Sequence, residues 1–146
     1  MEEDNNRHNG HTISHLTAHI VWVTKYRYPV LKGDIQSRCR DLIKQICIAE
    51  DVMILKGVVS LDHVHMHIEY PPKVSISDIM KSIKGRTSHH LQDEFPDLKK
   101  RYWGRHFWAT GYGVWSTGNI TDEMVQKYLE HHKNKDDNQD KTFILE

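Results

Sequence analysis

The sequence predicts an α+β domain of the ferredoxin-like (RRM-like) kind, a mostly antiparallel sheet with helices on one face. Three observations lead to this fold class. Apolar residues recur at helical spacing between residues 35 and 46. They alternate with polar residues between 64 and 70, as in a half-buried strand. The full pattern runs strand, helix, strand, strand, helix, strand, helix, and 146 residues suffice for one core of this kind.

The chain divides by composition into a folded domain and two polar ends. We expect a flexible N-terminus over residues 1–13, a single domain over 14–134 and a polar tail over 135–146. The formal net charge is zero, but the acidic ends leave the folded middle with a charge of +5. A modestly basic domain is compatible with a phosphate-bearing partner without identifying one.

Several absences indicate a cytoplasmic protein that does not contact membranes. No apolar run approaches the roughly 20 residues of a membrane span, and the acidic start does not resemble a signal peptide. Cys39 and Cys47 are eight residues apart on one expected helix, too far apart to pair, so we interpret them as reduced thiols.

The first half of the chain predicts two strands around a helix. The first strand is expected over 14–26, and Asp34 is expected to cap a helix whose apolar stripe is scaffold. The nearly all-apolar segment 52–61 predicts a strand buried on both faces and therefore central. A tight turn at residues 61–63 joins it to the strand at 64–70 as a hairpin.

The second half predicts two further helices and one strand. Ser75 is expected to cap a helix that ends near Pro96, and a basic, aromatic loop follows over 98–106. A strand is expected over 106–116, where two glycines indicate a bulge or a close approach. Thr121 is expected to cap the last helix.

The strand at 64–70 carries the most distinctive chemistry. His65 and His67 are two residues apart, so their imidazoles project from one face, close enough to share a cation. Two polar residues on a solvated face would have the same pattern, and an isolated His-x-His motif is short. The pair alone therefore does not establish a metal site.

Basic residues interleaved with aromatic ones suggest contact with nucleic acid. The cluster Lys25–Tyr28 suits phosphate binding and base stacking, but an ordinary strand end can also carry it. The segment 98–106 has the composition most typical of nucleic-acid binding, whereas Lys84 and Arg86 alone also fit a solvated helix face.

Five segments together resemble the TnpA-type transposases of the smallest bacterial insertion sequences, the single-tyrosine members of the HUH endonucleases. They match in order and spacing over most of the folded part of the chain: Ala18–Arg27, Asp62–His67, Lys84–Arg86, Trp103–Trp108 and Val125–Glu130. Each motif alone is weak, but five in register make the resemblance specific.

This resemblance implies an enzyme that cuts and rejoins single-stranded DNA at ends marked by hairpins. His65 and His67 would bind a divalent metal ion, magnesium or manganese, and Tyr128 on the last helix would be the nucleophile. The product would be a 5′-phosphotyrosine link and a free 3′-OH, so resealing needs no ATP. The resemblance also implies a homodimer with merged sheets.

One position departs from the family pattern. Members usually carry glutamine four residues after the tyrosine as the third metal ligand, and this chain carries His132. A metal site made of histidine ligands suits manganese, zinc, nickel or cobalt better than magnesium. We therefore expect His132 to be the third ligand, with Glu69 as a rival.

The residues expected to contact DNA are basic and lie in the matching segments: Lys25, Arg27, Lys84, Arg86 and Arg105. Two other functions stay open. A domesticated relative could process genomic repeat hairpins without moving an element, and a non-catalytic nucleic-acid-binding module would need neither metal nor Tyr128.

Overall fold

The computed structural model describes residues 4–116 and 123–131. Residues 123–131 are helical. The other elements, in chain order, are β1 (Arg7–Asn9), β2 (Thr12–Ser14), β3 (Leu16–Val23), the 3-10 turn η1 (Lys25–Arg27), α1 (Gly33–Ala49), β4 (Met53–Val59), β5 (His63–Tyr70), α2 (Ile76–Glu94), α3 (Pro96–Arg101) and β6 (Gly113–Trp115). None of the helices in the described part of the chain has the length and apolarity to span a membrane.

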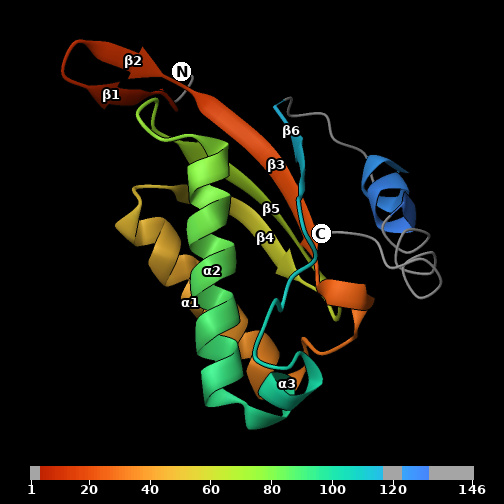
Figure 1. Ribbon diagram of the computed structural model, residues 1–146. Helices are drawn as coiled ribbons and strands as arrows, with labels where there is room; N and C mark the ends of the chain where they lie inside the picture. The colour runs from red at the N-terminus through yellow and green to blue at the C-terminus, as the bar shows by residue number, and fades with distance from the viewer. Residues whose placement is uncertain (1–3, 117–122, 132–146) are drawn as a thin grey trace.

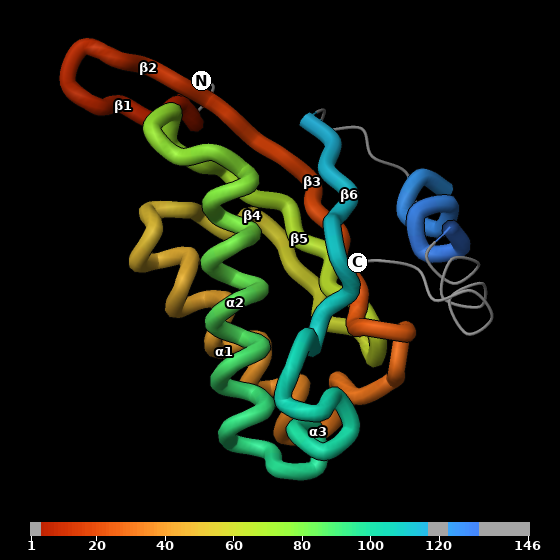
Figure 2. Tube along the Cα trace, viewed as in Figure 1, coloured from red at the N-terminus to blue at the C-terminus, as the bar shows by residue number. Residues whose placement is uncertain are grey.

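A four-stranded antiparallel sheet organises the molecule. Its strand order is β4-β5-β3-β6, with β3 and β5 in the centre. Helices α1 and α2 lie along one face of the sheet, and the helix at 123–131 lies on the other side (Figure 1). The path of the chain is easiest to follow in the tube view (Figure 2). The predicted α+β, ferredoxin-like fold class is confirmed.

The alternation predicted for β5 places its apolar residues in the main core. Val64, Met66 and Ile68 are buried against α1 and α2, together with Ala18, Ile20 and Trp22 of β3. Directly paired residues of antiparallel strands share a face. The opposite face of the two central strands therefore carries His19, Val21 and Val23 on β3 and His63, His65 and His67 on β5.

The strand expected to be central lies at the sheet edge. Among the residues that the structure describes, β5 is the only strand that pairs with β4, and Met53, Leu55 and Val58 are all exposed. An apolar run indicates that a strand can be buried, but it does not say by what. The prediction that 52–61 is buried on both faces is wrong within this chain.

The N-terminus, expected to be frayed, contains a hairpin of β1 and β2. The Arg7 guanidinium binds both oxygens of Glu69 at 2.7–3.2 Å and also binds Asp51 at 2.7 Å. Arg7 and Glu69 are largely buried, so this ion pair ties the hairpin to β5 and to the end of α1. Partners 62 residues apart leave no local signal in a sequence.

Four element boundaries also differ from those predicted. The first strand ends at Val23, and Tyr26 takes a left-handed φ of 61° in the turn that follows. Helix α1 begins at Gly33, so Asp34 lies in its first turn and does not cap it. Part of the predicted loop 98–106 is helix α3, and the strand expected over 106–116 is shortened to β6. The Ser75 cap is confirmed, because its Oγ accepts a hydrogen bond from the Asp78 N–H at 3.0 Å.

Candidate functional site

Three imidazoles gather on the sheet face opposite α1 and α2. The ring of His19 stacks on that of His67, with 3.9 Å between centroids and 7° between planes. His19 Nδ1 lies 3.4 Å from His65 Nε2, and the tautomer decides which nitrogen donates. The register explains the cluster, because His19 pairs directly with His67 across β3 and β5. Alternation along β5 then brings His65 beside them.

The donors present fit part of a metal site. His67 Nε2 is buried without a hydrogen-bond partner in the part of the chain that the structure describes, and a buried polar atom of this kind calls for a ligand, ion or water. Within residues 4–116 and 123–131, no group of three or more His, Cys, Asp or Glu is arranged to hold a metal ion. The predicted third ligand, His132, lies outside the described residues.

The helix at 123–131 packs on this same face. Its Val125 and Leu129 are buried against Val21 and Val23 of β3 and against Ala109. Apolar side chains one turn apart thus anchor the helix on the sheet. The predicted cap of this helix, Thr121, lies outside the described residues.

Tyr128 lies beside the strand that flanks the histidines. Its ring meets Trp115 edge-on, with 6.4 Å between centroids, and Trp115 pairs in register with His19. Gly113 makes this contact possible: a Cβ there would lie 2.6 Å from Trp115 Cη2 and 3.2 Å from Tyr128 Cδ2. The glycine therefore marks a close approach, one of the two predicted alternatives.

Burial raises the pKa of the Tyr128 hydroxyl above its ordinary value of 10.0. The phenol is therefore neutral at physiological pH, and a neutral phenol is a weak nucleophile. Any reaction at this oxygen needs an activating group close by.

An ion pair holds the turn after β3 to the C-terminal helix. Arg27 binds Asp62 Oδ2 at 2.9–3.0 Å and donates to the Leu129 carbonyl at 3.0 Å. His63 Nδ1 lies 2.8 Å from the other oxygen of Asp62. Burial alone would raise the pKa of Asp62, but the bond from His63 and the charge of Arg27 outweigh it, so the pKa falls below 3.8. Arg27 thus has a structural role, and its contact with DNA stays a prediction.

The other predicted DNA contacts are spread over the fold. Lys25, in η1, lies over the Tyr26 ring at 5.3 Å. The Lys84 ammonium donates to the carbonyls of Ala109 and Gly111, at 2.7 and 2.9 Å. Arg86 and Arg105 are exposed. Lys84 and Arg105 line the same hollow, so the fold brings these two residues together. Contact of any of these residues with DNA stays a prediction.

Glu69, the rival metal ligand, is 5% exposed and binds Arg7 through both of its oxygens. A carboxylate engaged in this way would have to release a buried arginine before it could bind a metal ion. We therefore treat Glu69 as an anchor for the N-terminal hairpin.

Comparison with known proteins assigns the family. The family model described as "Transposase IS200 like" matches residues 12–132, most of the chain. The chain belongs to the IS200-like transposase family. This match confirms the resemblance drawn from the five motifs, and it makes the chain a DNA transposase, a class of enzyme that cuts and rejoins DNA.

Curated relatives of this IS200-like transposase cover most of its length. The transposase of insertion sequence element IS200 from Salmonella typhimurium is 36% identical over 126 residues, 86% of this chain and 82% of the relative. The ISDra2 transposase TnpA from Deinococcus radiodurans is 29% identical over 83% of this chain and 86% of the relative.

Solved structures agree with the fold of the IS200-like transposase. A crystal structure of a candidate transposase from Deinococcus radiodurans matches with a TM-score of 0.80 and 27% identity, covering 86% of this chain and 97% of that chain. A REP-associated tyrosine transposase, solved bound to a REP hairpin, matches with a TM-score of 0.57 over 86% of this chain and 67% of that chain. At 16% identity this second likeness shows the fold alone.

Sequence reasoning missed His19 as a member of this transposase's histidine cluster. His19 lies in the segment predicted as the first strand, but nothing local in the sequence says which residue of β5 pairs with it. A register computed from the paired hydrophobic patterns of 16–23 and 63–70 could have found it.

Proposed function

We propose that this transposase cuts and rejoins single-stranded DNA with Tyr128 as nucleophile, next to a divalent metal ion held by His65, His67 and His132. One observation carries the proposal: the helix of Tyr128 packs on the sheet face that presents the histidines, and its ring contacts Trp115, the cross-strand neighbour of His19.

The proposed chemistry is an exchange of phosphodiester bonds. The Tyr128 oxygen attacks phosphorus, the bond from phosphorus to the 3′ oxygen breaks, and the 3′ oxygen leaves as a hydroxyl while the phenol gives up its proton. A 3′-OH from another DNA end then attacks the phosphotyrosine and releases the tyrosine. Each step replaces one ester bond by another, so no ATP is consumed.

The two imidazoles of the described residues suit a divalent ion, and His67 Nε2 is a buried nitrogen in need of a partner. When bound, such an ion withdraws charge from the scissile phosphate and lowers the barrier to attack. Histidine ligands suit manganese and softer metals better than magnesium. The protein's part is to orient Tyr128, whose burial keeps the phenol neutral until the phosphate arrives.

The proposed substrate is single-stranded DNA with hairpins near the cleavage points. The basic middle of the chain, with Lys25, Arg86 and Arg105, supports a phosphate-bearing partner. The related REP-associated transposase was solved with a REP hairpin, which favours the same kind of ligand here.

A homodimer is part of the proposal. Within residues 4–116 and 123–131, strand β4 is paired on one side only, and its Met53, Leu55 and Val58 are exposed. An exposed, apolar edge strand favours pairing with another chain. A second copy adding its own β4 would merge two sheets and cover these side chains.

Strand cleavage tests the proposal. Single-stranded oligonucleotides from the DNA flanking the gene, of both strands, are incubated with the protein and manganese or magnesium, and cleavage is followed on denaturing gels. We expect metal-dependent cleavage of one strand, lost in Tyr128→Phe and kept in the matched control Tyr70→Phe. Cleavage that persists in Tyr128→Phe, or without metal, would contradict the proposed mechanism.

A further inference from the structure

The largest exposed apolar side chain of the described residues is an indole. Trp103, in the turn after α3, is 86% exposed, whereas Trp22 and Trp108 are buried. Exposure of a ring this large forgoes the favourable burial that Trp22 and Trp108 have. A side chain kept in this position calls for a partner that covers it.

The backbone holds Trp103 outward in a fixed turn. Its φ is 57°, the left-handed region that bulky residues rarely adopt, and Gly104 follows at 66°. Three hydrogen bonds close the turn: Trp103 N–H to Lys100, Gly104 N–H to Lys99 and Arg105 N–H to Tyr102, at 3.3, 2.8 and 3.0 Å. Tyr102 is buried beneath it. Strain of this kind is often found at functional sites.

Positive charge surrounds the exposed indole. Residues 96–106 carry four lysines and arginines against the single carboxylate of Asp97. Within the described residues, no ion pair involves Lys99, Lys100 or Arg105. We call Lys99, Lys100, Trp103 and Arg105 the basic tip. A ring flanked by cations that lack carboxylate partners suits a flat, negatively charged ligand.

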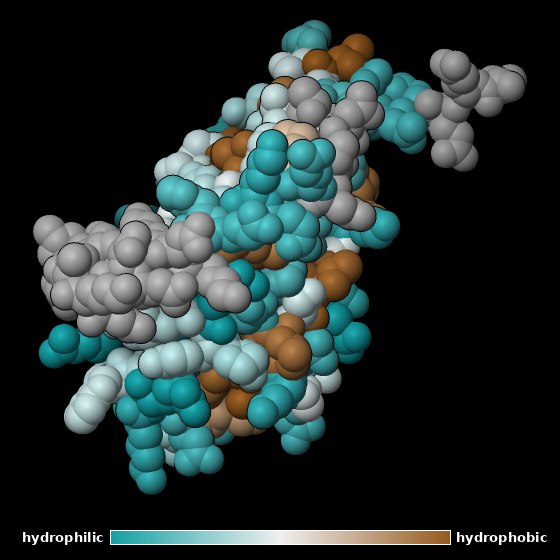
Figure 3. Space-filling model, turned by 90° about the vertical axis from the view of Figure 1, so that its right-hand side faces the viewer, coloured by the Kyte–Doolittle hydropathy of each residue, from teal (hydrophilic) through white to brown (hydrophobic). Residues whose placement is uncertain are grey.

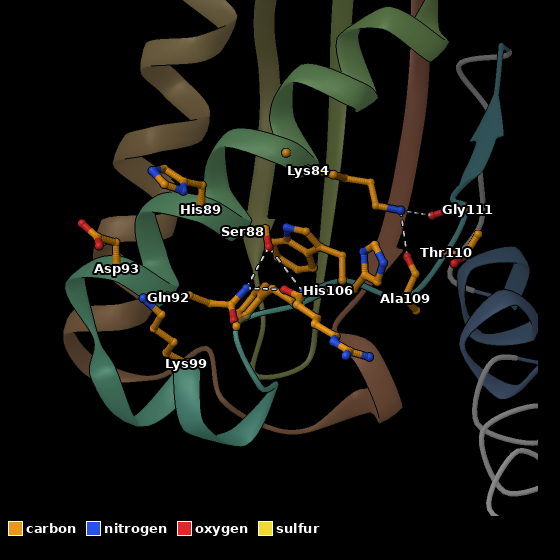
Figure 4. A pocket seen from close by; sticks show the side chains of 15 residues that line it. Lys84, Ser88, His89, Gln92, Asp93, Lys99, His106, Ala109, Thr110 and Gly111 are labelled. Carbon is orange, nitrogen blue, oxygen red and sulfur yellow. Dashed lines mark hydrogen bonds between the residues drawn. The ribbon is translucent and has the colours of Figure 1, made fainter. Parts of the chain in front are cut away.

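A hollow of about 470 Å³ adjoins the basic tip, between α2 and residues 104–111 (Figure 4). Lys99 and Gly104 line both this hollow and the shallower one beside Trp103. Arg105 of the basic tip also lines the hollow of about 470 Å³, and Lys84 adds another positive charge there. The hollow and the indole therefore form one continuous surface.

Gln92 is one of the residues that line this hollow. Its Nε2 donates to the Arg105 carbonyl at 2.6 Å and to Ser88 Oγ at 3.0 Å, which fixes the orientation of the amide. Its Oε1 is buried and has no hydrogen-bond partner among residues 4–116 and 123–131. A phosphodiester of the DNA backbone has no hydrogen to donate to such an oxygen, whereas nucleobases carry N–H groups. Cations together with an unmatched acceptor favour a nucleotide over a simple anion.

We propose that the basic tip binds unpaired nucleotides of DNA, with Trp103 stacked on one base, Lys99 and Arg105 on the flanking phosphates, and the next nucleotide in the adjoining hollow. This inference rests on the proposed function, which supplies DNA as the substrate. Helix α3 packs against α2, on the side of the sheet opposite the histidines. The basic tip is therefore a contact separate from the cleavage face.

An unpaired base can come from a single strand or from the loop of a hairpin, and three oligonucleotides distinguish them. We would measure the affinity of fluorescein-labelled DNA for the protein by anisotropy, using an unstructured strand, a hairpin with a loop and a blunt duplex. Trp103→Ala is expected to weaken binding of the strand, the hairpin or both by about tenfold or more, since base stacking carries energy of that size. The affinity for the duplex is expected to stay unchanged.

Two further variants sharpen the test. Ile48→Ala removes another strongly exposed apolar side chain, on α1, and is expected to bind all three DNAs like the wild type. Lys99→Ala is expected to weaken binding and to lower the slope of log affinity against log salt by about one. Trp103→Phe, which keeps an aromatic face, is expected to retain more affinity than Trp103→Ala.

Unchanged affinity of Trp103→Ala for the strand and the hairpin would overturn the inference, as would an equal loss for the duplex. A shift in tryptophan fluorescence with anionic vesicles but not with DNA, lost in Trp103→Phe, would overturn it in favour of a membrane contact. Cleavage by the wild type, measured in parallel, separates the two proposals. If the wild type cleaves DNA and Trp103→Ala binds DNA as the wild type does, the role of the basic tip is refuted and the proposed function stands. If binding depends on Trp103 but the wild type does not cleave DNA, the proposed function is refuted and the role of the basic tip stands.

Discussion

At the scale of single residues, His19 is the side chain that contacts both proposed metal ligands, His65 and His67. It stacks on His67 and lies within hydrogen-bonding distance of His65, so it limits the rotation of both rings. Residues that orient metal ligands affect metal affinity without binding the metal themselves. His19 is therefore a positioning residue for the proposed metal site.

We predict that His19→Ala lowers the affinity for Mn²⁺ or Co²⁺ by about tenfold or more, because the two ligand rings become free to turn. Titration calorimetry with Mn²⁺ and the visible spectrum of bound Co²⁺ measure the effect without DNA. The exposed His15 serves as control, since His15→Ala removes an imidazole of the same strand region outside the cluster. Equal metal affinity in both variants would remove His19 from the site.

At the scale of elements, the C-terminal helix is held to the sheet by two kinds of contact. Val125 and Leu129 supply the apolar one, and Arg27 supplies a polar one through the Leu129 carbonyl. Asp62 holds Arg27 in place, with a pKa below its ordinary 3.8. The placement of Tyr128 thus depends on an ion pair between the turn after β3 and the turn before β5.

The lowered pKa of Asp62 makes the strength of the ion pair between Arg27 and Asp62 depend on pH. A carboxyl whose pKa is lower in the folded state stabilises the fold above its unfolded pKa, and the contribution is lost as the pH falls through the folded value. We predict that Asp62→Asn costs about 1–3 kcal/mol at pH 7 and clearly less at pH 3. Urea unfolding at both pH values measures this.

Asp93→Asn, at an exposed position of α2, is the matched control and is expected to change stability little at either pH. A cost of Asp62→Asn that is equal at pH 3 and pH 7 would show that the carboxylate charge does not stabilise the fold.

At the scale of the whole molecule, two features matter: the polarity of the surface and the position of the exposed sheet edge. From the side that carries β6, hydrophilic residues surround small apolar patches (Figure 3). Strand β4 is an edge strand of the sheet. The helix of Tyr128 lies on the sheet face opposite α1 and α2 (Figure 1). Proposed subunit contact and proposed chemistry thus use different parts of the sheet.

We predict that the wild type elutes with the mass of two chains in size-exclusion chromatography with light scattering, and that Val58→Lys on β4 elutes as a monomer. A lysine on an edge strand hinders strand pairing. Ile48→Lys, which adds the same charge at an exposed position of α1, is expected to stay dimeric. A monomeric wild type, or a dimeric Val58→Lys, would place the subunit contact elsewhere or exclude it.

Some features encoded locally were predicted correctly, although the Asp34 cap was not. The alternation along β5 separated Met66 from its two histidine neighbours, and Ser75 capped α2 as expected. Features that depend on distant partners were not. The apolar run of β4 did not reveal that it is an edge, and Arg7 gave no sign of Glu69, its partner 62 residues away. The same reason hid the approach of His19 to His67, which register alone determines.

The central claim is that Tyr128 forms the covalent bond to DNA, and peptide mapping tests it most directly. Single-stranded DNA labelled at its 3′ end is cleaved with manganese, the adduct is purified in SDS, and nuclease and trypsin reduce it to a tagged peptide for mass spectrometry. We predict that the nucleotide resides on residues 128–133, which trypsin releases between Lys127 and Lys133, and that Tyr128→Phe gives no adduct. A nucleotide on any other peptide, or an undiminished adduct in Tyr128→Phe, would contradict the account.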